Sequence, residues 1–152
     1  INPKSRLFLI GAVVTTELYM DAIKEYIINN RISNVIFSGH VSFPDIIAYY
    51  KLADIFLCES EHEGFCVPLL EAMTFDVPVV AYSSSAIPYT MGDSGVLFTD
   101  KNHPLVAELL NLVAANPDFR QKIIEKQRER LEFFDIDKTK SLFADLINPW
   151  LD

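Results

Sequence analysis

The chain has 152 residues, half of them hydrophobic, so it is long enough for one well-packed domain and too short for two. Its net charge of −8 argues against nucleic acid as a partner, because such binding depends on neutralising phosphates with Lys and Arg. No apolar run is long enough for a transmembrane helix and no secretory signal is visible, which predicts a cytoplasmic protein whose Cys58 and Cys66 are reduced thiols.

Strand-like and helix-like patterns alternate through the first part of the chain. The predicted elements are a buried strand at Leu7–Ile10, a helix from a Thr16 cap to about Asn30, a strand at Val35–Phe37, a helix through Tyr49 and Tyr50 that starts at a Ser42–Asp45 capping box, and a strand at Ile55–Cys58.

The second part continues the alternation and then becomes helical. The predicted elements are a helix from about Phe65 to Thr74, a strand at Val77–Ala81, a short helix near Pro88–Met91, a strand at Val96–Phe98, and helices at Pro104–Ala115, Pro117–Phe134 and Asp137–Asn148, with Asn116 and Asp137 placed as caps. This order predicts an α/β fold, a Rossmann-like parallel sheet with helices on both faces.

Two glutamates flank the predicted turn from strand into helix. Glu63 follows the Ile55–Cys58 strand. Glu71 lies beyond it with seven residues between the two, among apolar residues that predict partial burial and a need for a polar partner. If the intervening segment is helical, eight steps separate the carboxylates by about 12 Å. That spacing suits an elongated ligand with hydroxyls at both ends and an anionic middle, such as a sugar nucleotide, facing the positive end of the helix dipole.

The same region carries a family resemblance. The motif residues are Ala53–Asp54, Ser60, Glu63–Phe65, Leu70–Met73 and Val77–Ala81, and weaker likeness extends through Gly39–Val41, Tyr49–Tyr50 and Gly92–Leu97. In this order they resemble the donor-site signature of the retaining family-four glycosyltransferases of group 1, which are GT-B enzymes built from two Rossmann-like domains. The resemblance covers roughly residues 5–134 and implies the C-terminal, donor-binding domain, lacking its first βα unit.

The resemblance implies a role for each residue of the motif. Glu63 would hold the reacting sugar and is the candidate catalytic residue, and Glu71 would bind the ribose hydroxyls. Backbone N–H groups of Gly64, Phe65, Cys66 and Val67 would face the phosphates or the sugar. Val41 would pair its backbone with the nucleobase.

The implied activity is transfer of a hexose from a nucleotide sugar to a glycan or lipid-linked acceptor, with no metal or organic cofactor. The family's N-terminal acceptor domain and its Arg/Lys diphosphate clamp have no counterpart in residues 1–152, so an acceptor domain in cis or in trans is the expected partner. Through that domain the parent protein could associate with the cytoplasmic face of a membrane. This chain by itself is expected to be inactive, and a non-catalytic nucleotide-sugar-binding or assembly module is the alternative.

Several features have competing explanations. Cys66 stands where many relatives have Gly, and a thiol at a helix N-terminus also permits a nucleophile, but no His or Asn is placed by motif to complete such a site. Asp135-Ile136-Asp137 spells a metal–diphosphate motif, yet it lies between two predicted helices, where capping explains it. Ser83–Ser85 and Tyr89 differ from the family's pattern near the expected sugar, so sugar specificity stays open.

Overall fold

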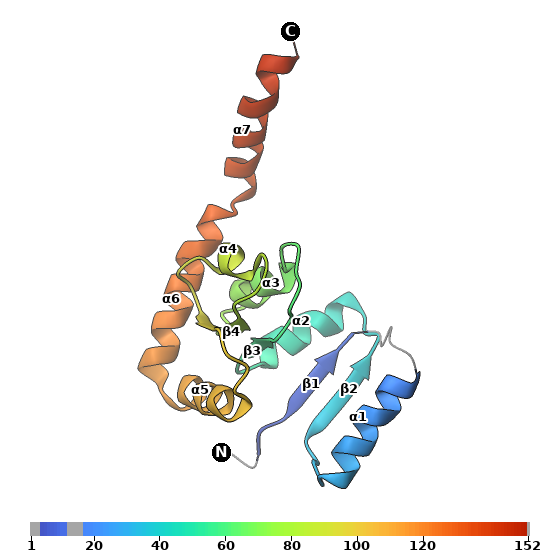
Figure 1. Cartoon of the computed structure of the whole chain (residues 1–152). Coiled ribbons are helices and arrows are strands. Elements are labelled where there is room, and N and C mark those ends of the chain that lie inside the picture. The colour runs from blue at the N-terminus through green and yellow to red at the C-terminus, as the bar shows by residue number, and fades with distance from the viewer. Residues whose placement is uncertain (1–3, 12–16, 152) are drawn as a thin grey trace. The chain divides into compact units, whose positions relative to one another are not determined.

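The computed structural model describes residues 4–11 and 17–151, and the chain forms two compact units that meet in sequence between residues 49 and 50 (Figure 1). The first unit comprises residues 1–49 and the second residues 50–152. Every paired strand in the described residues runs parallel to its neighbour, which confirms the predicted α/β class.

The first unit contains one parallel strand pair with helices that follow each strand. Its elements are β1 (Leu7–Ile10), α1 (Glu17–Asn29), β2 (Val35–Gly39) and most of α2 (Phe43–Leu52). Leu7 lies opposite Val35, and the register shifts after Leu9 so that Ile10 lies opposite Gly39. The predicted Thr16 cap lies outside the described residues.

The prediction that β1 is buried is wrong, although its position as a strand is confirmed. Its four apolar side chains, Leu7–Ile10, are each 42–45% exposed. An apolar sequence indicates a strand, but burial also requires neighbouring elements to cover it. Among the described residues β1 pairs with β2 alone, so one of its edges has no partner strand.

The predicted capping box at the start of α2 is confirmed. The Ser42 hydroxyl donates to Asp45 Oδ2 at 2.5 Å, and the Ser42 backbone N–H donates to the same oxygen at 3.2 Å. The Asp45 N–H donates to Ser42 Oγ at 3.4 Å, so the two backbone N–H groups find partners that the first helical turn cannot supply within the helix.

The second unit contains a three-stranded parallel sheet of order β3-β4-β5 and most of the helices. Its elements are β3 (Phe56–Cys58), α3 (Val67–Thr74), β4 (Val79–Tyr82), α4 (Ile87–Met91), β5 (Val96–Phe98), α5 (His103–Ala115), α6 (Pro117–Phe133), α7 (Ile136–Ile147) and the short 3₁₀ helix η1 (Asn148–Trp150). Leu57 and Val96 lie opposite Val80, on either side of the central strand.

Side chains of β4 divide the core between the two faces of this sheet. Val79 and Ala81 pack in one buried cluster with residues of α3 and α4, including Leu69 and Ile87. Val80 packs on the opposite face with residues of α5 and α6. Because successive residues of a strand point to opposite faces, this division confirms that helices cover both sides of the sheet.

The strand β4 begins later than the sequence predicts, at Val79 instead of Val77. Pro78 has no backbone N–H, so it cannot donate to a neighbouring strand. A fully buried side chain of α6, Gln127, bonds to the backbone on either side of Pro78. Its Nε2 donates to the Val77 carbonyl at 2.9 Å, and its Oε1 accepts from the Val79 N–H at 2.8 Å.

The ends of the last two helices show one confirmed cap and one correction. Asn116 Oδ1 accepts from the Phe119 N–H at 3.0 Å and caps α6 as predicted. The cap of α7 is Asp135, and the prediction of Asp137 is wrong. Asp135 has a non-helical backbone and accepts from the N–H groups of Asp137 and Lys138, so Asp137 already lies inside the helix.

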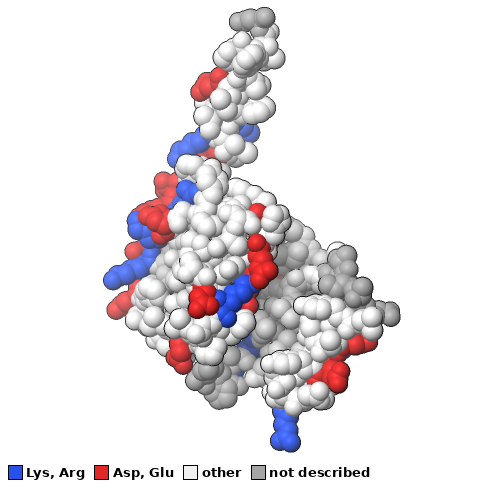
Figure 2. Space-filling model, viewed as in Figure 1, with Lys and Arg blue, Asp and Glu red and all other residues white. Residues whose placement is uncertain are grey.

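The exposed surface of α6 carries charges of both signs next to one another, and they are visible along this helix in Figure 2. One of its pairs joins Lys126 and Glu129 at 2.7 Å. By contrast, α7 has no buried side chain. Among the described residues no helix is both long and apolar enough to cross a membrane.

Candidate functional site

The candidate site lies around the loop of residues 59–66, which joins the carboxyl end of β3 to the start of α3. Side chains from later segments hold the backbone of this loop. Ser84 Oγ donates to the Ser60 carbonyl at 2.6 Å, Thr90 Oγ1 donates to the Phe65 carbonyl at 2.6 Å, and Lys101 Nζ donates to the Glu59 carbonyl at 3.0 Å. The loop is therefore fixed by contacts that are distant in sequence.

Cys66 makes the transition from this loop into α3. It is buried and adopts a left-handed backbone conformation, with φ 64° and ψ 63°. This conformation is uncommon for any residue but glycine, which agrees with the expectation that many relatives have glycine here. The helix that follows starts at Val67, so the positive end of its dipole lies next to the loop.

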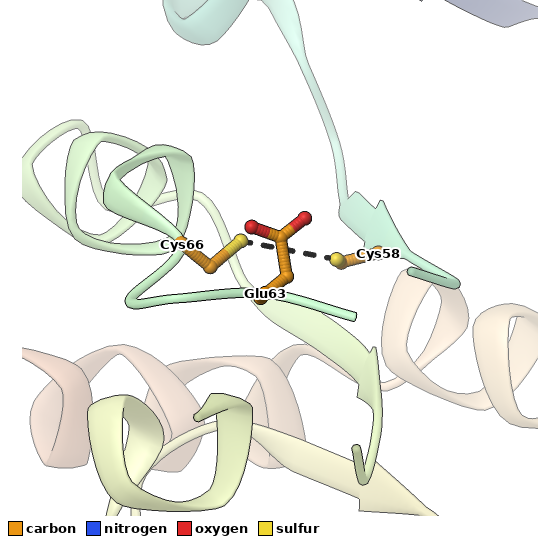
Figure 3. A group of neighbouring side chains, drawn as sticks. All are labelled: Cys58, Glu63 and Cys66. Carbon is orange, nitrogen blue, oxygen red and sulfur yellow. Dashed lines mark hydrogen bonds between the residues drawn. The ribbon is translucent and has the colours of Figure 1, made fainter. Parts of the chain in front are cut away.

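Glu63 lies in the loop, half-buried, and is close to both cysteines of the chain. The ligand atoms of Cys58, Glu63 and Cys66 all lie within 4.8 Å of one another (Figure 3). Burial raises the pKa of the Cys66 thiol, and Cys58 and the Glu63 carboxylate raise it further, whereas a hydrogen bond from the Leu69 backbone acts in the opposite direction. A buried thiol with a raised pKa is a poor nucleophile, which argues against the nucleophile interpretation.

Glu71 lies on α3 and has the polar partner that its apolar surroundings predict. It is half-buried, and the Tyr50 hydroxyl donates to its Oε2 at 2.9 Å. The Tyr50 ring stacks on Phe75, with ring centroids 5.6 Å apart and an interplanar angle of 8°. Burial raises the pKa of Tyr50, and the hydrogen bond to Glu71 raises it further, so the tyrosine stays protonated and donates.

The separation inferred for the two carboxylates needs correction. Only the segment from Val67 to Glu71 is helical, because Glu63 to Cys66 belong to the loop. Four helical steps give a rise of about 6 Å, not the 12 Å that eight steps would give. The left-handed Cys66 delays the start of the helix to Val67, and the residue pattern did not indicate this delay.

The other predicted donor-site residues fall in different parts of the chain. Gly64 and Val67 are exposed and Phe65 is half-buried, all in or beside the loop. Val41 is half-buried in the loop after β2 and belongs to the first unit. His40 and His62, the histidines next to Val41 and Glu63, are exposed.

Two features of this site were not found from the sequence. Tyr50 belongs to the resemblance, but no role was assigned to it, because its bond to Glu71 joins residues 21 positions apart. The proximity of the cysteines was missed because seven intervening residues do not match a metal-binding pattern. The available signal was their place at the two ends of one strand-to-helix loop.

A parallel sheet covered by helices on both faces defines a Rossmann-like α/β domain, and acidic side chains lie around one of its strand-to-helix turns here. Comparison with known families then assigns the chain more closely. The sequence pattern described as glycosyl transferases group 1 matches residues 1–130. The chain belongs to this family and corresponds to its C-terminal domain.

Solved structures of GT-B glycosyltransferases share the fold. HepE from Anabaena, solved in complex with UDP-glucose, superposes with a TM-score of 0.83 at 21% identity, over 97% of this chain and 42% of HepE. The C-terminal domain of the group 1 glycosyltransferase LpcC from Francisella tularensis superposes with a TM-score of 0.67 at 25% identity, over 79% of this chain and 64% of that domain.

Curated relatives are glycosyltransferases of considerably greater length. The alpha-monoglucosyldiacylglycerol synthase of Streptococcus pneumoniae is 28% identical over 72% of this chain, which spans 25% of that protein. The O-antigen chain mannosyltransferase B of Escherichia coli is 39% identical over 39% of this chain, which spans 16% of that protein. The chain therefore spans a quarter or less of the length of these two relatives.

Proposed function

We propose that this chain is the donor-binding part of a retaining glycosyltransferase, which moves a hexose from a nucleotide sugar to a glycan or lipid-linked acceptor. The observation that carries the proposal is the arrangement around the start of α3. Glu63 precedes the helix in a loop held by distant contacts, and Glu71 lies on the helix with its carboxylate oriented by Tyr50. Family membership supports the proposal.

Each part of this arrangement would meet a different part of the donor. We propose that Glu71 accepts hydrogen bonds from the ribose hydroxyls. The Tyr50 hydroxyl donates to only one of the two oxygens of this carboxylate. The start of α3, with the backbone from Gly64 to Val67, would face the phosphates. Glu63 would contact the sugar that is transferred. Val41 would pair its backbone with the base.

In this reaction the nucleoside diphosphate leaves as negative charge develops on its phosphate oxygens. Oriented backbone N–H groups and a helix N-terminus stabilise such charge without reorganisation. We propose that no metal ion is needed for transfer, and that cationic side chains from the family's first βα unit of the donor-binding domain complete the phosphate site in the parent protein. This chain alone would then lack transferase activity.

The proposal is tested on the complete enzyme with a panel of nucleotide sugars, and NMR of the product gives its anomeric configuration. Retention is expected with at least one hexose donor. Glu71→Ala should weaken binding of the nucleoside diphosphate by about 1–3 kcal/mol, the scale for hydrogen bonds to a charged group. The matched control is Glu108→Ala, an exposed glutamate of α5, which should leave affinity unchanged.

Two results would count against the proposal. Unchanged affinity in Glu71→Ala, measured by calorimetry, would remove Glu71 from the donor site. Nucleotide-sugar binding without transfer to any acceptor would instead favour the non-catalytic binding module.

A further inference from the structure

The two cysteines of the chain and Glu63 form a compact group of potential metal ligands. Cys58 is the last residue of β3, Cys66 precedes α3, and Glu63 lies in the loop between them. Both cysteines are buried free thiols, and their sulfur atoms lie 4.0 Å apart. Figure 3 shows the Glu63 carboxylate next to the line that joins the two sulfur atoms. Among the described residues this is the one group of three ligand side chains that satisfies such a distance limit.

The distances match the requirements of a tetrahedral thiolate site. Zinc–sulfur bonds are about 2.3 Å long, so two thiolates on a tetrahedral zinc ion stand about 3.8 Å apart. The observed sulfur separation of 4.0 Å is close to this value. The carboxylate oxygen, within 4.8 Å of both sulfurs, has to move inward to reach its usual bond length of about 2.0–2.2 Å. Because Glu63 belongs to a loop, a small movement is sufficient.

We propose that Cys58, Cys66 and Glu63 bind a thiophilic divalent cation of the zinc class, with the fourth position open to water. Sulfur ligands select such a metal over Mg²⁺ or Ca²⁺, which prefer oxygen. Half-exposed Glu63 provides the open side through which the ion enters. As the two metal–sulfur bonds form, each thiol releases its proton to the solvent.

This cation would compete with the donor for one carboxylate. Glu63 ligates the ion in this proposal and contacts the sugar in the proposed function, so the cation should inhibit transfer. This consequence rests on the proposed function, whereas the metal site does not. Metal binding is therefore measured in the absence of nucleotide, and its outcome is independent of the transfer assay.

The test is a titration of the full chain with cobalt(II), which serves as the spectroscopic probe. A phosphine reductant keeps both thiols reduced during the titration. We expect one equivalent of Co²⁺ to produce a sulfur-to-cobalt charge-transfer band, which an equivalent of Zn²⁺ removes. Because the chain contains only two cysteines, such a band can come only from Cys58 and Cys66. Absence of a saturable band, with both thiols shown to be reduced, overturns the proposal.

Variants identify the ligands. Loss of a group that merely supports a ligand already weakens metal binding by about 10–100-fold, so Cys58→Ser and Cys66→Ser should each weaken Zn²⁺ binding at least tenfold. Glu63→Gln should weaken it while the charge-transfer band remains. His62→Asn, which changes the exposed neighbour of Glu63, is the control and should bind as the wild type does.

A second measurement covers the case in which a serine variant fails to fold. In the wild type, Zn²⁺ should slow alkylation of Cys58 and Cys66 together, as measured by mass spectrometry of the peptides that contain them. Equal alkylation rates with and without Zn²⁺ would overturn the proposal. Unaltered affinity in a folded Glu63→Gln variant would remove Glu63 from the ligand set and refute the site as stated.

Discussion

The hydrogen bond from Tyr50 to Glu71 can be removed with little other change by Tyr50→Phe. The ring that stacks on Phe75 stays in place, and the variant lacks only the hydroxyl that donates to Glu71 Oε2 at 2.9 Å. The same hydroxyl also lies 3.4 Å from the Pro68 carbonyl, a weaker contact. The substitution therefore isolates the bond that orients the carboxylate proposed to bind ribose.

The expected magnitudes follow from the burial of the pair. A hydrogen bond to a charged group contributes about 1.5–3 kcal/mol, but water can replace it in part because both residues are only half-buried. We expect the free energy of unfolding to fall by about 1–2 kcal/mol. Nucleotide binding would then have to immobilise a free Glu71 side chain at about 0.5–1.5 kcal/mol, which weakens affinity about two- to tenfold.

Denaturant unfolding and calorimetry with a nucleoside diphosphate, both on the complete enzyme, check the two values. Tyr49→Phe is the matched control, because Tyr49 accepts a hydrogen bond from the neutral Ser38 hydroxyl at 2.9 Å. It should change stability slightly and leave nucleotide affinity unchanged. If Tyr50→Phe binds nucleotide as tightly as the wild type, Tyr50 does not prepare Glu71 for the ligand, and this reasoning is refuted.

Three further predictions concern other residues. Glu63→Gln should lower kcat more than nucleotide affinity, because its proposed contact is the sugar being transferred, and wild-type turnover would contradict this role. Gln127→Ala leaves two buried backbone groups without partners and should lower the free energy of unfolding by about 2–4 kcal/mol in denaturant titrations, whereas the exposed Gln121→Ala should change it little. The Arg128 guanidinium lowers the pKa of Asp76, so their pair stabilises the fold above the ordinary Asp pKa of about 4 and is lost as the pH falls through the lowered value. Asp76→Asn should therefore lower the free energy of unfolding by no more than about 1 kcal/mol at neutral pH, and in acid its stability should equal that of the wild type. A difference in stability that persists in acid would exclude this pair as the cause.

The order of strands and helices was predictable because it depends on local patterns. Alternating apolar segments, Asn116 and the Ser42–Asp45 box all act within a few residues of their own position. The partial burial of Glu71 was predictable for the same reason, since its helical neighbours are apolar. The sequence therefore indicated that Glu71 needs a partner without indicating which residue provides it.

Features that depend on contacts between distant segments were not predictable from the pattern. Gln127 bonds to the Val77 carbonyl and the Val79 N–H across 48 to 50 positions, and nothing in α6 distinguishes it from an ordinary polar helix residue. The exposure of β1 likewise depends on which elements cover it. In each case the outcome is determined by packing partners that are absent from the local sequence.

The serines at residues 83–85, where the sequence departs from the family pattern, contact the loop that carries Glu63. Many relatives have a glycine-rich turn here, and Ser85 adopts a positive φ of 45°, which is strained for a residue with a side chain. Its hydroxyl donates to the Glu61 carbonyl at 3.2 Å, and that of Ser84 donates to the Ser60 carbonyl at 2.6 Å. Glycine could make neither bond. Ser84 and Ser85 thus hold the loop that carries Glu63 through two bonds, and we expect any effect of these two serines on sugar recognition to act through the position of that loop.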